Sequence, residues 1–136
     1  MDFARVQVWL AATYWQPGVV REVVEHQARN SALVIGAFTM DGTQVGYTRV
    51  ISDKLRFGYL CDVVVDEAHR GKGVGRAMVQ FALKHPEYIT VQDWTLKTRD
   101  AHGVYSALGF RPITDPVNRP EAWMALRPAA NTQQAQ

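Results

Sequence analysis

The sequence has few of the features that mark a secreted, membrane or metal-binding protein. Its 136 residues include one cysteine, Cys61, which excludes an internal disulfide and a cysteine-rich metal site. No apolar run approaches the roughly 20 residues that a membrane helix needs. The N-terminus also lacks the basic and apolar stretches of a signal peptide. We therefore expect a cytoplasmic protein that uses no metal and has no membrane partner.

A strong excess of charge of one sign is missing too. Lys and Arg number 15 against 13 Asp and Glu, so the net charge is only +2 and gives no reason to expect nucleic acid as a partner. An apolar content of 47% with 21% charged residues is ordinary for a globular protein. At this length we expect one domain, over residues 1–127. Residues 128–136 are small and polar and are predicted to be a disordered tail.

The order of the apolar patterns predicts a mixed α+β fold. Two amphipathic helices come first, starting near Phe3 and Val20, and Asp2 is placed to cap the first of them. Three antiparallel strands follow, and the dipeptide Asp41-Gly42 predicts a tight hairpin turn between the first two. We expect these strands at residues 32–40, 44–51 and 56–66.

After the third strand the pattern changes to a strand–helix–strand unit. Apolar residues at helical spacing from Val74 onward predict a helix, and residues 91–98 alternate like a strand, so the unit predicts a right-handed parallel crossover. A short helix at 101–108 follows, with Asp100 as its cap and Gly109 as its left-handed end. The fold class is α+β, with a mixed, mostly antiparallel central sheet and helices on both faces. The last two strands are expected at residues 110–113 and 122–126.

The stretch VVVDEAHRGKGVGRAM, residues 63–78, has three glycines at alternate positions between the third strand and the next helix. Glycines let a backbone pass close to a phosphate, and the first amides of a helix face an anion with their positive dipole end. Arg70, Lys72 and Arg76 add positive charge there. A nucleoside-triphosphate loop would need Ser or Thr where Gly73 stands, and a dinucleotide loop would need a doubly wound sheet. A turn needed only for packing would leave the three cations unexplained.

The segment Arg70-Gly71-Lys72-Gly73-Val74-Gly75 matches the pattern [Arg/Gln]-x-x-Gly-x-[Gly/Ala] of the GNAT acetyltransferase superfamily. With LCDVVVDEAHRGKGVGRAMV, WTLKTRDAHGVYSALGF and the order of elements, the chain from about Trp9 to Leu126 resembles small, single-domain bacterial members. The resemblance implies the acyl-CoA N-acyltransferase fold. It also implies transfer of acetyl from acetyl-CoA to a primary amine by direct attack, without an acyl-enzyme. Members usually open with a strand before the first helix; here either the sheet lacks that strand or the start of the sequence omits it.

The resemblance assigns the acetyl-CoA site and a catalytic acid. The glycine loop would bind the pyrophosphate, and backbone groups of the third strand would pair with the pantetheine arm. Tyr105 stands where many members place a tyrosine that protonates the departing thiolate, and a core tyrosine is the alternative interpretation. The expected acetyl-CoA-binding residues are Val63, Val64, Val65, Arg70, Gly71, Lys72, Gly73, Val74, Gly75 and Arg76.

The general base is less determined by the sequence. Asp62 matches a position where many relatives carry an acidic or amide side chain. A carboxylate with Leu60 and Val64 on its nominal face suits general-base work. The alternative is a carboxylate that hydrogen-bonds the sheet or binds a cationic acceptor. Lys97 stands where some relatives have a glutamate, so proton removal through water is a further route. Cys61 is interpreted as a small buried residue, because no base beside the thiol is evident.

The acceptor pocket is expected between Tyr14–Gly18 and Thr114–Glu121. Aromatic walls with Asp62, Asp115 and Glu121 nearby favour a small cationic amine as the acceptor, and a peptide amine is the alternative. A homodimer is left open. The rival function is a non-catalytic acyl-CoA-binding or sensor module on the same fold.

Overall fold

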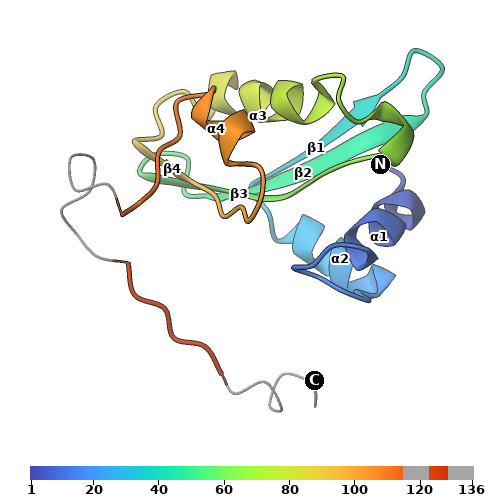
Figure 1. Cartoon of the computed structure of the whole chain (residues 1–136), viewed down its shortest axis with the longest axis horizontal. Coiled ribbons are helices and arrows are strands. Elements are labelled where there is room, and N and C mark those ends of the chain that lie inside the picture. Colours follow the sequence, from blue (N-terminus) through green and yellow to red (C-terminus); the bar gives the residue numbers. More distant parts are fainter. Residues whose placement is uncertain (115–122, 129–136) are drawn as a thin grey trace.

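The computed structural model describes residues 1–114 and 123–128, and its elements follow the predicted order (Figure 1). In chain order these elements are α1 (Phe3–Ala11), α2 (Arg21–Arg29), β1 (Leu33–Phe38), β2 (Gln44–Ser52), β3 (Phe57–Val65), the 3-10 turn η1 (Glu67–His69), α3 (Val74–Lys84), β4 (Asp93–Thr95) and α4 (His102–Ser106). None of the helices in these ranges is long and apolar enough to cross a membrane.

The four strands form one mixed sheet in the order β1-β2-β3-β4. The first three are antiparallel neighbours, whereas β4 runs parallel to β3 and is connected to it through α3. The helix α3 covers one face of the sheet, and α1 and α2 cover the other (Figure 1). The predicted α+β class with helices on both faces and the predicted parallel crossover are therefore confirmed.

The sheet separates two hydrophobic cores. One lies under α3 and the other under α1 and α2, so β2 and β3 are buried on both faces and their sequences do not alternate cleanly. The core under α3 contains Ile35, Val50, Leu60, Met78, Val79, Ala82 and Tyr88. The core under α1 and α2 contains Val6, Leu10, Val24, Tyr47 and Val64.

The start of the chain agrees with its predicted capping. The Asp2 carboxylate accepts a hydrogen bond from the Arg5 amide at 3.2 Å and so satisfies one of the free amides of the first turn. No strand precedes α1 in the described residues, and β1 lies at the edge of the sheet.

The predictions beyond β4 are partly wrong. The strand expected at residues 110–113 does not form, because the Phe110 amide donates to the Tyr105 carbonyl and its ring packs edge-on against Tyr105. Asp100 does not cap α4, since Ala101 precedes that helix and no side chain caps it. Gly109, with φ +97°, does end this region in the left-handed conformation.

The last predicted strand is not seen at residues 123–126, which are described as irregular. Its first residue, Ala122, lies outside the described residues, as does the predicted tail from residue 129 onward. The strand predicted at residues 91–98 forms only over Asp93–Thr95. The predicted domain boundary at residue 127 remains a prediction.

Candidate active site

The candidate site lies where β3 and β4 part. These strands pair only through three positions, Phe57–Asp93, Gly58–Trp94 and Tyr59–Thr95. From Leu60 to Val65, β3 therefore has β2 as its one strand neighbour within the described residues. The other side of this stretch can pair its backbone N–H and C=O groups with an extended ligand. Val63, Val64 and Val65, which were predicted to bind the pantetheine arm of acetyl-CoA, lie on this stretch.

A β-bulge interrupts β3 at Asp62. The register changes so that Asp62 and Val63 together lie opposite Thr48. Asp62 has φ +58°, a conformation that is uncommon for residues other than glycine and that aspartate tolerates better than most. The Thr48 hydroxyl donates to the Cys61 carbonyl at 2.8 Å and satisfies a backbone acceptor beside the bulge. The bulge is thus held by a specific hydrogen bond.

The bulge shifts which residues of β3 face which core. Leu60 packs under α3, and so do Val63 and Val65, whereas Val64 packs under α1 and α2. The prediction that Leu60, Asp62 and Val64 share one face is therefore wrong, because one inserted residue reverses the alternation of a strand. The Asp62 carboxylate instead turns toward the connection between α1 and α2.

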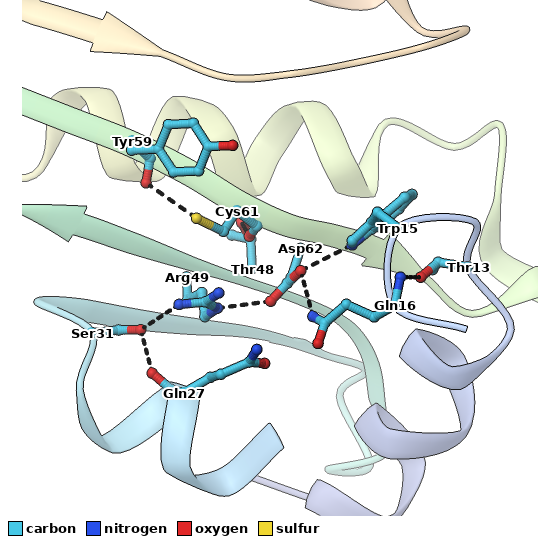
Figure 2. A network of polar contacts seen from close by, with 10 residues as sticks. All are labelled: Thr13, Trp15, Gln16, Gln27, Ser31, Thr48, Arg49, Tyr59, Cys61 and Asp62. Atoms are coloured by element: carbon cyan, nitrogen blue, oxygen red, sulfur yellow. Dashed lines mark hydrogen bonds and ion pairs between the residues drawn. The ribbon is translucent and has the colours of Figure 1, made fainter. Parts of the chain in front are cut away.

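The Asp62 carboxylate lies in a buried polar network (Figure 2). Its Oδ2 forms an ion pair with Arg49 Nε at 2.7 Å, and its Oδ1 accepts hydrogen bonds from Trp15 Nε1 and Gln16 Nε2, both at 2.9 Å. The side chains of Asp62 and Arg49 are only 4% and 12% exposed. Burial lowers the pKa of Arg49, but the hydrogen bond and charge of Asp62 outweigh it, so the net pKa is raised and the guanidinium stays charged.

Cys61 lies beside this network and is buried. Burial raises the pKa of its thiol to about 11, and the charge of Asp62 adds to this effect although that of Arg49 opposes it. The thiolate, which is the nucleophilic form, is therefore scarce at neutral pH. This agrees with the interpretation of Cys61 as a packing residue.

The Cys61 thiol is expected to react with a disulfide reagent at pH 8 roughly 100-fold more slowly in the native protein than in the unfolded chain. A pKa about two units above that of a free thiol lowers the thiolate fraction by about that factor. The measurement is the rate of colour release in buffer and in guanidinium chloride. Equal rates in the two solvents would contradict the buried, protonated thiol.

The glycine loop between β3 and α3 has the backbone that a close ligand requires. Gly71 and Gly73 have φ +74° and +81°, and no atom lies within 4 Å of the position a Cβ would take at either residue. Gly73 is the N-cap of α3, and no side chain in the described part of the chain accepts a hydrogen bond from the first amides of this helix. A Cβ on Gly75 would lie 3.6 Å from Val65, which is ordinary van der Waals contact, so an alanine would fit at this position. Open space and unpaired donors therefore meet at the start of α3.

The same loop carries uncompensated positive charge. Arg70, Lys72 and Arg76 are exposed, and none of them forms an ion pair with a carboxylate of the described residues. Arg70 Nε donates to the Val65 carbonyl at 3.1 Å, which ties the loop to the end of β3. Amides, a helix N-terminus and three cations make a site that fits a pyrophosphate.

Tyr105 is half-buried on α4. Its ring contacts Phe110 edge-on, with the ring centroids 6.0 Å apart, and packs against the core under α3. Burial raises the pKa of its hydroxyl above the usual 10, and proximity to Tyr14 adds to the effect. The hydroxyl is therefore protonated at neutral pH and has no hydrogen-bond acceptor among the described residues. No hydrogen bond joins Tyr105 to Asp62; instead Tyr14, whose charge acts on Tyr105, contacts the Trp15 ring, and Trp15 donates to Asp62.

The sequence analysis missed the partners of Asp62. Arg49 lies in an otherwise buried strand, and a charged residue in such a place needs a counter-ion, which was the available signal. Trp15 and Gln16 belong to the segment expected to line the acceptor pocket, and nothing in the sequence indicated their hydrogen bonds to Asp62.

The other expected wall of the acceptor pocket, which includes Asp115 and Glu121, lies outside the described residues except for Thr114. No cluster of three or more potential metal ligands occurs in the described part of the chain.

Comparison with known proteins gives an independent assignment. A family model described as "Acetyltransferase (GNAT) domain" matches residues 23–112. A crystal structure of a protein assigned to the GNAT family from Xanthomonas campestris pv. campestris is 34% identical, with a TM-score of 0.79 over 91% of this chain and 87% of that one. None of the curated proteins matches the chain.

More distant structures support the fold. A GNAT-family acetyltransferase from Streptococcus pneumoniae is 19% identical, with a TM-score of 0.68 over 93% of each chain. Glucosamine-6-phosphate N-acetyltransferase from Arabidopsis thaliana is 15% identical, with a TM-score of 0.63 over 95% of this chain and 88% of that one. The family match covers more than half of the sequence and includes the glycine loop, β4 and Tyr105. The chain therefore belongs to the GNAT family of acetyltransferases.

Proposed function

We propose that the protein transfers the acetyl group of acetyl-CoA to a primary amine of a small molecule. The observation that carries this proposal is the glycine loop with three cations that form no ion pair within the described residues, near the end of a β3 edge that has no strand partner there. The free strand edge and the cationic loop together suit one ligand in which an extended arm is joined to a pyrophosphate. A peptide amine is the alternative acceptor.

The two halves of this surface would hold different parts of acetyl-CoA. Amides of Gly71–Arg76 would bind the pyrophosphate with the side chains of Arg70, Lys72 and Arg76. Backbone groups of Val63–Val65 would pair with the amide-containing arm, in the manner of an added strand. Because only the short turn η1 separates the loop from the end of β3, the arm would run from the loop back toward the bulge at Asp62. Acetyl-CoA itself supplies the activated acyl group.

Direct transfer makes three demands. The amine must lose a proton, since an alkylammonium has a pKa of about 10 and no lone pair. The carbonyl must be polarised, for which backbone amides near Val63 are candidates. As the C–N bond forms and the C–S bond breaks, the sulfur needs a proton. Tyr105 is proposed to donate that proton and to regain one from solvent. A tyrosine is protonated at neutral pH, and burial raises the pKa of Tyr105 further above the usual 10.

The role of Asp62 in this scheme is constrained by its partners. An ion pair with Arg49 of β2 and two hydrogen bonds already occupy its oxygens, which supports the alternative of a carboxylate that hydrogen-bonds the sheet. Removal of the amine proton through water is then the proposed route. Since Arg49 balances the charge of Asp62, this carboxylate gives little reason to favour a cationic acceptor.

Replacing Gly73 by valine is expected to weaken acetyl-CoA binding at least 10-fold. A β-branched residue is strained at φ +81°, and its side chain would occupy the open space in front of the loop. Calorimetric titration with acetyl-CoA measures the change. The matched control is Gly42→Val, which places the same strain at φ +90° in the β1–β2 hairpin and should leave binding unchanged. Equal affinity of a folded Gly73→Val protein and the wild type would contradict the loop assignment.

A screen for thiol release from acetyl-CoA over a library of small amines and amine-bearing peptides tests the reaction. Release with one or more small amines supports the proposal. Tight acetyl-CoA binding without release for any amine would instead favour the acyl-CoA-binding or sensor module. Absence of both binding and release would overturn the proposed function.

A further inference from the structure

The segment Tyr14–Gln16, between α1 and α2, is attached to β3 and to Arg99, in the stretch of chain that follows β4. On the β3 side, Trp15 and Gln16 donate to Asp62 (Figure 2). On the β4 side, the Tyr14 hydroxyl accepts a hydrogen bond from the Arg99 amide at 3.0 Å. The Arg99 guanidinium also lies 3.8 Å from the centroid of the Tyr14 ring. The segment therefore bridges the opening between the two strands.

The bridge presents aromatic surface. Tyr14 and Trp15 are 45% and 43% exposed, and their rings meet edge-on with centroids 4.9 Å apart. In the proposed acetyl transfer, the glycine loop would hold the pyrophosphate, and the exposed rings of Tyr14 and Trp15 would form part of the wall that the acceptor meets. A shift of the segment would therefore change how the acceptor is held.

The anchor of this bridge is rigid. Arg49 holds Asp62 from one side and is itself held by Ser31 Oγ at 3.3 Å, while the bulge fixes the backbone of Asp62. A carboxylate has about four acceptor positions, and three protein donors already use Asp62. A general base must present an open oxygen to the amine. The oxygens of Asp62 are directed at protein donors, and its side chain is almost fully buried.

We infer that Asp62 is a positioning residue that holds Trp15 and Gln16 in the acceptor wall, and that it does not take the proton of the amine. This inference rests on the proposed acetyl transfer. It assigns the specificity for the acceptor to the Tyr14–Gln16 segment and makes Asp62 act through that segment.

Two variants separate positioning from proton transfer. Asp62→Asn removes the charge, and the one carbonyl oxygen of the asparagine cannot accept from Arg49 and from Trp15 and Gln16 at the same time, so while Arg49 is present the segment loses its acceptor. The double variant Trp15→Phe/Gln16→Ala removes both donors while keeping the ion pair with Arg49. Both are expected to raise the acceptor KM by on the order of 10- to 100-fold, because misplacement of a wall by about 1 Å has effects of that size. The acidic limb of the pH–rate profile and the affinity for acetyl-CoA should stay in place in both. If Asp62→Asn does not fold, the double variant carries the test alone.

The matched control is Trp9→Phe, which also removes an indole donor from a carboxylate, that of Asp66, whose partners do not include the Tyr14–Gln16 segment. Its acceptor KM should equal that of the wild type. Adding Asp62→Asn to the double variant should raise KM little further, since residues that act through one contact are not additive. A flattened acidic limb in Asp62→Asn, with wild-type KM in the double variant, would overturn the inference and make Asp62 the base.

Hydrogen exchange tests the same inference without any substrate. Peptides that cover residues 12–20 should exchange faster in Asp62→Asn than in the wild type, while peptides from α3 should not change. Unchanged exchange at residues 12–20 would overturn the positioning role. If the wild-type protein neither binds acetyl-CoA nor releases thiol, the proposed function is overturned. The exchange result would still decide, independently of that function, whether Asp62 holds the Tyr14–Gln16 segment.

Discussion

Tyr105→Phe is expected to lower turnover by on the order of 10²- to 10⁴-fold, the usual span for general-acid catalysis, with little change in acetyl-CoA affinity. The variant keeps the ring and its edge-on contact with Phe110 and removes only the proton donor. The hydroxyl can stabilise the sulfur only as the C–S bond breaks, so its contribution belongs to the transition state. Steady-state rates and calorimetric titration with acetyl-CoA measure the two quantities.

The pH dependence has a defined sign. The acid must be protonated to act, and burial raises the pKa of Tyr105 above the usual 10. Loss of its proton should therefore lower turnover only above about pH 10, and no decline between pH 7 and 9 should come from this group. The control is Tyr88→Phe, since Tyr88 is also buried and its hydroxyl has no partner among the described residues. Tyr88 lies away from the opening, and its variant should turn over at the wild-type rate.

A second acyl donor decides how Tyr105 acts. With a donor whose leaving thiol has a lower pKa, the sulfur needs less protonation, so Tyr105→Phe should recover part of its deficit. An equal deficit with both donors would mean that Tyr105 positions a group without protonating the sulfur. Wild-type turnover in the variant would support the core-tyrosine interpretation.

The local patterns of the sequence were sufficient for most of the fold. The apolar stripe of α3 and the alternating glycines before it specify a strand, a loop and a helix by spacing alone, and these elements form within one or two residues of their predicted positions. The Asp2 cap and the Gly109 end were also predictable, since each depends on residues within a few positions of it.

The features that the sequence did not predict depend on distant contacts. The bulge puts a non-glycine residue at positive φ, which no local pattern indicates, and it changes the face of every later residue in β3. The Trp15 and Gln16 bonds to Asp62 join residues 47 and 46 positions apart. The strand at 110–113 failed for a different, local reason, because packing of Phe110 on the nearby Tyr105 outweighed its strand propensity.

Arg49→Met is expected to lower the free energy of unfolding by about 3–5 kcal/mol, because it leaves the Asp62 carboxylate buried without its counter-ion. The methionine keeps much of the length of the side chain, so the loss reflects the missing charge and hydrogen bonds more than lost packing. Urea unfolding gives the difference from the midpoint and slope. Arg21→Met is the matched control, since Arg21 pairs with Glu25 at 2.9 Å while 58% exposed. That change should stay within about 0.5 kcal/mol.

Removing the charges of both Arg49 and Asp62 distinguishes two causes of the instability: a buried carboxylate without a counter-ion, and the loss of the bond between the two side chains. Arg49→Met/Asp62→Asn leaves no buried charge, and the asparagine carbonyl can still accept from Trp15 and Gln16 at a φ that asparagine tolerates. The double variant should therefore be more stable than Arg49→Met alone, even though it contains one more substitution. If the double variant is instead destabilised by the sum of the two single-variant effects, the Arg49–Asp62 ion pair contributes net stability of its own. Its role is then more than to compensate the charge of the buried carboxylate. If Arg49→Met is no more harmful than Arg21→Met, the carboxylate reaches water in solution. In that case the network is not the buried anchor of the α1–α2 connection.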